Sequence, residues 1–253
     1  MNIFEQFGLK EVANVTFYNI ETGLPELFLD SLKVSTIEQT AENVDARGGW
    51  GNPALVSWDY NKEVNVTLED ALFSSASLKV MMGAKSVEAK NGEVAEVSYN
   101  ELIKVDDAGK GKLSYAPKAG KKVYFLNEET NEYEVITVNG QDFTVPVVDK
   151  TIRVFYVIEV NGTNGDAVTI TIDAGTFGGT YRLVGDTVVR SRETGKDEPF
   201  QFVMEKVKVN SEVTFTMEAE GDPATFNMPI KVLKDDNGNM FKLIKYNLPT
   251  ASM

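Results

Sequence analysis

The fold of this chain is decided by a stretch near its start, Val12-Ala13-Asn14-Val15-Thr16-Phe17-Tyr18-Asn19-Ile20-Glu21-Thr22-Gly23-Leu24-Pro25. The first part of this stretch is mostly β-branched or aromatic, which is typical of a β-strand. The second part holds a glycine and a proline, which favour a turn. The chain then returns through Leu27 to Thr36. We therefore predict a β-hairpin here.

The same alternation of β-rich segments and Gly- or Pro-containing turns continues along the chain, so the sequence predicts a mostly β protein. Pro229 lies inside one expected strand, which indicates an edge or a bulge there, because proline has no N–H to donate. After the hairpin and Trp58 to Leu68, strands are expected over residues 94–105, 112–115, 122–126, 133–138, 143–147, 152–160, 168–172, 181–190, 200–209, 213–220, 225–233 and 240–246.

One strand and one helix are expected between residues 58 and 83. The strand alternates, and its apolar even-numbered positions predict one buried face. A helix is expected from an N-cap at Thr67, with Asp70 in its first turn, to a C-cap at Gly83. The even-numbered apolar residues are Trp58, Tyr60, Val64, Val66 and Leu68, and the apolar stripe of the helix is Leu72, Phe73, Ala76 and Val80.

The domain organisation predicted from turn content is one β domain interrupted by a second. The middle segment, 87–165, has short strands at regular spacing, as in a small β-sandwich. Turn-rich sequence flanks it, Gly92 on one side and Asn161 to Gly165 on the other. We expect residues 1–86 and 166–253 to form the main domain and 87–165 to be an inserted subdomain.

Composition excludes several classes of function. Cysteine and histidine are both absent, which removes disulfides, thiolate nucleophiles, imidazole bases and the usual zinc ligands. The formal net charge of −13 opposes specific binding to nucleic acid, although an acidic wall lets a polyanion slide past. No stretch approaches the roughly 20 apolar residues of a membrane span, and no export signal opens the chain. We expect a protein made in the cytoplasm and without a membrane partner.

Candidate catalytic and metal sites all have simpler explanations. The spacing of Asp235, Asn237 and Asn239 resembles a calcium loop, but Met240 and Tyr246 stand where glycine and glutamate are needed. An Asn-Gly hairpin explains these residues better. Paired acids are expected at the solvated surface, and a glycine cluster opens no phosphate-binding helix. The paired acids are Glu69-Asp70, Asp106-Asp107, Glu128-Glu129 and Glu218 with Glu220, and the glycine cluster is Gly175, Gly178 and Gly179. We predict no catalytic, metal or cofactor site.

A glycine-rich loop between Val44 and Pro53 carries the candidate contact residues. A loop of this kind is either disordered decoration or a contact arm, and large aromatic and arginine side chains favour the contact arm. We expect Trp50 and Arg47 to bind an adjacent subunit, with glycine supplying mobility before assembly. The predicted inter-subunit residues are Arg47, Gly48, Gly49, Trp50 and Asn52.

Taken together, these segments resemble the tail tube proteins, or major tail proteins, of tailed bacteriophages. The resemblance rests on the order of several short pieces and on no single motif. The pieces are the hairpin Asn14 to Thr36, the loop Ala46 to Asn52, Val56-Ser57-Trp58-Asp59-Tyr60, Leu68-Glu69-Asp70-Ala71-Leu72, Gly178-Gly179-Thr180-Tyr181-Arg182, Glu198-Pro199-Phe200-Gln201-Phe202 and Glu220-Gly221-Asp222-Pro223-Ala224-Thr225-Phe226.

The resemblance implies a β-sandwich with one flanking helix, six copies of which join their sheets into a ring-shaped β-barrel. Such rings stack into a tube that conducts DNA into the host without binding it specifically. It also implies a virion location, with tape-measure, tail-terminator or baseplate proteins as partners, and an acidic lumen. The segment 87–165 would then be a family-variable, immunoglobulin-like insertion that faces outward.

Two other classes compete with the tail tube. One is a β-sandwich binding module of a virion or cell surface that holds a glycan or host protein, with Tyr115, Tyr124 and Tyr133 lining the site. These aromatics have a simpler explanation as core positions. The other class is a glycosidase that works with carboxylates alone.

Overall fold

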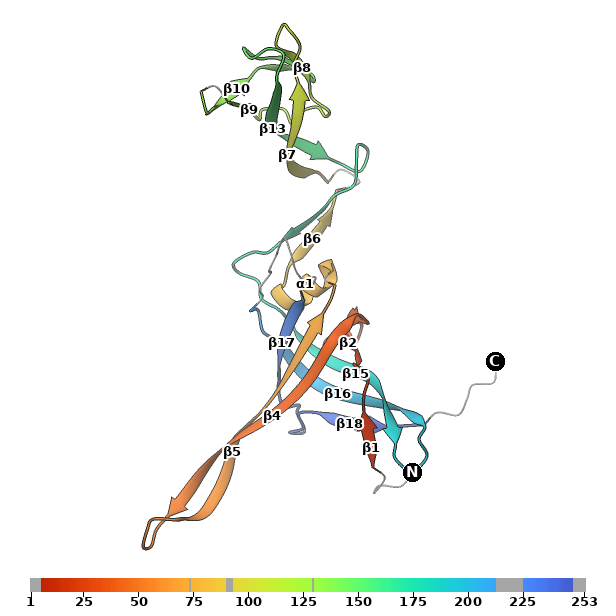
Figure 1. Cartoon of the computed structure of the whole chain (residues 1–253). Helices are drawn as coiled ribbons and strands as arrows, with labels where there is room; N and C mark the ends of the chain where they lie inside the picture. The colour runs from red at the N-terminus through yellow and green to blue at the C-terminus, as the bar shows by residue number, and fades with distance from the viewer. Residues whose placement is uncertain (1–5, 73, 90–92, 129, 213–224, 248–253) are drawn as a thin grey trace, which may run out of the picture. The chain divides into compact units, whose positions relative to one another are not determined.

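The computed structural model describes residues 6–72, 74–89, 93–128, 130–212 and 225–247. The described chain is mostly β, with several antiparallel sheets and one short helix, which confirms the predicted class (Figure 1). It divides into two compact units. Unit 1 comprises Met1–Lys85 and Thr171–Met253, and unit 2 comprises Ser86–Ile170.

Unit 1 is built on a nine-stranded antiparallel sheet. Seven strands follow one another in the order β3-β2-β15-β16-β17-β5-β4, while β1 pairs with β15 and β18 pairs with β16. The strands are β1 Phe7–Leu9, β2 Asn14–Asn19, β3 Pro25–Leu29, β4 Leu32–Arg47, β5 Ala54–Asp70, β15 Thr180–Ser191, β16 Asp197–Val209, β17 Phe226–Val232 and β18 Lys242–Lys245.

The predicted N-terminal hairpin is present as β2 and β3, but the single return strand expected from Leu27 to Thr36 was wrong, because β3 ends at Leu29 and β4 begins at Leu32. The Asn19 carbonyl accepts the N–H of Gly23 at 2.9 Å, and Gly23 has a φ of 70°, a conformation that glycine adopts without strain. The Asn19 side chain accepts two further N–H groups of the turn, those of Glu21 and Thr22. The inner face of the sheet buries side chains such as Phe17, which is fully inaccessible to solvent.

The helix begins later than the sequence predicted. Residues up to Asp70 continue β5, and the helix α1 spans Ser75–Met82. The capping prediction at Thr67 was wrong because Thr67 pairs with both neighbouring strands, β4 and β17. Ser74 is the N-cap, and it exchanges hydrogen bonds with Ser77 in a capping box. The predicted end is correct, since Gly83 is the C-cap with a φ of 65°.

The hairpin expected at the Asn237-Gly238 turn does not form, because the strands on either side of this turn pair with β16. β17 and β18 do not pair with each other; β17 pairs with the Val207–Val209 part of β16 and β18 with its Phe200–Val203 part. The turn therefore returns the chain to the same edge of β16. Pro229 lies in β17 just past the end of its pairing with β16, and its carbonyl accepts the N–H of Asn210. The nitrogen of Pro229 faces the same side as this carbonyl, toward Asn210 and away from β5. The strand expected over residues 213–220 and the turn that follows it lie outside the described residues.

Unit 2 has its own core between two sheets. One sheet has the order β10-β9-β13-β7 and the other β11-β12-β8. Fully buried side chains such as Phe125, Leu113 and Val154 fill the space between them. A strand expected over residues 112–115 is instead β8, which ends at Lys112. The strands are β7 Ala95–Lys104, β8 Lys110–Lys112, β9 Val123–Asn127, β10 Glu132–Ile136, β11 Val138–Asn139, β12 Asp142–Thr144 and β13 Thr151–Val160, and a separate pair joins β6 Lys85–Glu88 to β14 Val168–Thr171.

Candidate assembly surface

The longest strands of unit 1 extend past the sheet as a two-stranded ribbon. β5 pairs with β17 only from Val64 to Asp70. Beyond that point, among the described residues, β4 and β5 pair only with each other, from Glu42 opposite Tyr60 to Arg47 opposite Ala54 (Figure 1). A two-stranded ribbon of this kind is marginally stable in water by itself. Its exposed side chains are therefore candidates for contact with another molecule.

A β-bulge at Asn61 decides which side chains share a face of this ribbon. The register changes from Thr40 opposite Glu63 to Glu42 opposite Tyr60, so β5 has one more residue than β4 between these pairs. Asn61 has a φ of 51°, and its side chain donates to Glu42 at 2.8 Å. One extra residue reverses the alternation of a strand. Even-numbered residues of β5 therefore lie on opposite faces before and after the bulge.

The ribbon consequently has one apolar face and one polar face. Val44 lies opposite Trp58 on the apolar face, and the aromatic side chain is 55% exposed. The apolar side chains of this apolar ribbon face are Val44, Ala46, Val56, Trp58 and Tyr60, with Glu42 at its inner end, and the polar face carries Asn43, Asp45, Ser57 and Asp59. The expectation that Trp58 and Tyr60 share the buried face of Val64, Val66 and Leu68 was wrong, because the bulge turns them to the other side.

The predicted contact residues lie at the tip of the ribbon. β4 continues to Arg47, so the loop is confined to residues 48–53 and is shorter than expected. Within it the Asn52 N–H donates to the Gly49 carbonyl at 3.1 Å, and Trp50 is completely exposed. Arg47 forms an ion pair with Asp45 of its own strand, at 2.6 Å. Their role between subunits stays a prediction.

The apolar ribbon face was not predicted from the sequence as a contact surface. Trp58 and Tyr60 were assigned to a buried face because strict alternation was assumed through Asn61, whereas Val44 was placed in the contact loop. Asparagine tolerates the left-handed conformation better than most residues, so Asn61 was the available signal for a bulge. The ends of the main sheet add two further open edges, since β3 and β4 each have one strand neighbour among the described residues. Open edges can pair with another chain.

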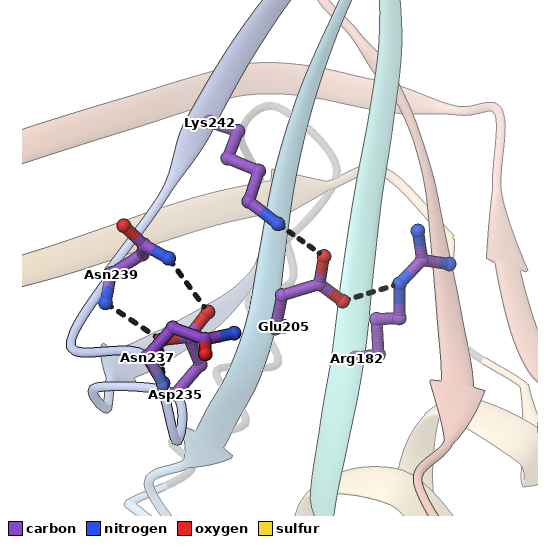
Figure 2. A network of polar contacts seen from close by, with 6 residues as sticks. All are labelled: Arg182, Glu205, Asp235, Asn237, Asn239 and Lys242. Atoms are coloured by element: carbon purple, nitrogen blue, oxygen red, sulfur yellow. Dashed lines mark hydrogen bonds and ion pairs between the residues drawn. The ribbon is translucent and has the colours of Figure 1, made fainter.

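Ion pairs occupy the outer side of the sheet between β15, β16 and β18. Glu205 accepts hydrogen bonds from Lys242 at 3.0 Å and from Arg182 at 2.8 Å, as Figure 2 shows. The bond from Lys242, together with that from Arg182, holds the pKa of the Glu205 carboxyl below its usual value. The carboxylate of Glu205 on this part of the sheet is thus paired with two basic side chains. The acidic lumen of a tube stays a prediction.

The calcium-like spacing near residue 235 serves a turn. The Asp235 carboxylate accepts the N–H groups of Asn237 at 2.9 Å and Asn239 at 2.7 Å (Figure 2). Desolvation alone would raise the pKa of Asp235, but the hydrogen bonds from Asn239 and Asn237 outweigh it and lower the pKa. Among the described residues no group of three or more acidic side chains is arranged to hold a metal ion.

The burial of Asp70 and of the candidate glycan aromatics differs from the expectation: Tyr115, Tyr124 and Tyr133 are 49%, 38% and 64% exposed, so their assignment as core positions was wrong. Asp70 is buried and accepts the Ser31 hydroxyl at 2.6 Å, which corrects the expectation that it is solvated. The Tyr133 ring contacts Phe155, which lies opposite Tyr124, so these two tyrosines share a face of the sheet, whereas the Tyr115 ring contacts Tyr99. Glu129, Glu218 and Glu220 lie outside the described residues. In the part of the chain that the structure describes, no helix has the length and apolar character needed to cross a bilayer.

The fold and this surface define a β-rich protein with open sheet edges and an exposed apolar ribbon. The chain matches the YomU/Tube protein family over residues 7–244 and belongs to that family. This is a family of structural tube proteins, and no enzyme family is indicated. The chain is also 30% identical over 132 residues to the SPbeta prophage-derived protein YomU of Bacillus subtilis strain 168. That alignment covers 51% of this chain and 47%, about half, of the relative.

Proposed function

We propose that this chain is the tail tube protein of a tailed bacteriophage. Six copies join their sheets into a ring, and the rings stack into the tube that conducts the genome into the host. Membership in the YomU/Tube family and a prophage-derived relative support this proposal. In this proposal the protein is a virion component whose partners are its own copies and the tape-measure, tail-terminator or baseplate proteins.

The observation that carries the proposal is the apolar ribbon face. Four half-exposed apolar side chains follow one another on one side of a two-stranded element, and the opposite side is polar. Monomeric proteins rarely leave such a surface open, because contact with a partner removes it from water at a gain of roughly 25 cal/mol per Å². The open edges of β3 and β4 provide a second surface through which identical copies can pair, in a closed ring without free edges.

A pair of matched substitutions on neighbouring residues tests this proposal. Val56→Lys places a charge on the apolar ribbon face, whereas Ser57→Lys places the same charge on the polar face of the same ribbon. Both sites are exposed, so neither change should alter the folding of the free chain. We expect electron microscopy to show tubes for the unaltered protein and Ser57→Lys, and their loss for Val56→Lys. Equal assembly of all three proteins would contradict the proposal.

A further inference from the structure

Unit 2 carries an open hollow on its surface. Its volume is about 760 Å³. It is lined by the end of β7, by residues of β8 and β12, and by residues in and beside β11. Three lysines contribute to the lining, Lys104, Lys110 and Lys112, and all three are exposed.

The charge of this hollow is opposite to that of the protein around it. Residues 86–170 contain nine Lys and Arg against fourteen Asp and Glu, so the unit as a whole is acidic. In the hollow, however, three ammonium groups face one carboxylate, that of Asp142. None of the three ammonium groups has an ion-pair or hydrogen-bond partner among the residues that the structure describes, whereas Lys118 in the same unit contacts both Glu96 and Glu159. An uncompensated positive cluster attracts anions.

Packing beneath the hollow fixes the direction of two of these lysines. The Phe143 ring lies under Gly111, where an added Cβ would be 2.4 Å from a ring atom, so residue 111 faces the core. Side chains alternate along a strand, which places Lys110 and Lys112 together on the outer side. Their direct neighbours across the pair are Thr144 and Asp142. The two ammonium groups are thus attached to a paired, anchored strand.

We infer that this hollow binds an acidic saccharide, a sugar chain that carries carboxylate or phosphate groups. The lysines match the acid groups, since an ammonium is a strong donor to carboxylate and phosphate oxygens. The neutral side chains of Thr137, Asn139 and Thr144, which are also exposed in the lining, can exchange hydrogen bonds with sugar hydroxyls. A nucleic acid duplex fits less well, because its long row of phosphates would also meet the acidic remainder of the unit.

The test measures binding of labelled tetragalacturonate to the full chain by fluorescence anisotropy. Fructose 1,6-bisphosphate is the phosphate-bearing competitor, maltotetraose the uncharged one and a 20-base-pair DNA duplex the nucleic acid. The site variant carries Lys104→Gln, Lys110→Gln and Lys112→Gln. The control carries Lys122→Gln, Lys196→Gln and Lys206→Gln, which change the net charge equally at exposed positions outside the hollow.

We expect the site variant to bind at least tenfold more weakly and the control to bind like the unaltered chain. Asp142→Asn should strengthen binding, because it removes the one carboxylate from the lining, and this gain does not depend on the folding of the triple variant. Competition by fructose bisphosphate would identify phosphate as an accepted acid group, and its failure would restrict the site to carboxylates. The inference is overturned if the control loses as much affinity as the site variant, if maltotetraose competes equally, if DNA binds more tightly, or if nothing binds.

Discussion

Replacing Trp50 with alanine should weaken assembly without destabilising the free protein. The side chain is fully exposed at the tip of the ribbon, so its removal costs the isolated chain no buried contact. A change of this kind alters the free energy of unfolding by less than about 0.5 kcal/mol. Any larger effect must therefore arise where another copy covers the indole ring.

The size of the assembly effect follows from the area that a partner could cover. A tryptophan buries roughly 150–250 Å². At roughly 25 cal/mol per Å² this gives an upper value of about 4–6 kcal/mol. Association retains only part of that gain, and interface tryptophans commonly contribute about 2–4 kcal/mol. Since each 1.4 kcal/mol is a factor of ten, the critical concentration for tube formation should rise about 30-fold to 700-fold.

Sedimentation of tubes over a concentration series measures the critical concentration, and thermal unfolding below that concentration measures stability. Trp50→Phe should recover part of the lost assembly. Leu102→Ala, which removes an exposed apolar side chain in unit 2, should leave the critical concentration unchanged. If Trp50→Ala lowers the unfolding temperature while the folded fraction assembles normally, the indole ring supports the fold and the reasoning is refuted.

Three further predictions concern the independence of the two units, the cap of α1 and the ion pairs of Glu205. Replacing residues 86–170 with a short flexible linker between Lys85 and Thr171 should leave a soluble chain that still forms tubes, because each unit has its own core; insoluble protein would contradict this. Ser74→Ala should lower the free energy of unfolding by about 1 kcal/mol through loss of the α1 cap, whereas Ser74→Asp should not, and equal unfolding curves would disprove the capping role. Glu205→Gln should destabilise the protein at pH 7. Because the folded-state pKa of Glu205 is lowered, the difference in the free energy of unfolding between the two proteins should vanish as the pH falls through that pKa. A difference that does not change with pH in denaturant titrations would exclude the ion pairs as its cause.

Local sequence predicted those parts of the fold that depend on neighbours in the chain. The β2–β3 turn around Gly23 and the end of α1 at Gly83 both need a left-handed glycine, and both were found where the sequence placed them. The start of α1 could not be found in this way. Thr67 and Asp70 have the spacing of a helix cap, but pairing with two neighbouring strands outweighs that weak local preference.

The candidate site depended on pairings between distant segments, which local sequence does not specify. The Asn-Gly turn at residue 238 was correctly assigned as a turn, yet the strand beside it is β16 and not its sequence neighbour. In the ribbon, Trp58 was expected in a core but lies on an exposed face, because of the bulge at Asn61. A one-residue shift reverses every side chain beyond it, so the assembly surface became visible only with the register in place.

Electron microscopy of the purified full-length protein is the most direct test of tube formation. We expect hollow tubes built from stacked rings with sixfold symmetry, in which a neighbouring copy covers Trp58 and the rest of the apolar ribbon face. Single particles without rings or tubes, at every concentration up to the solubility limit, would contradict this expectation.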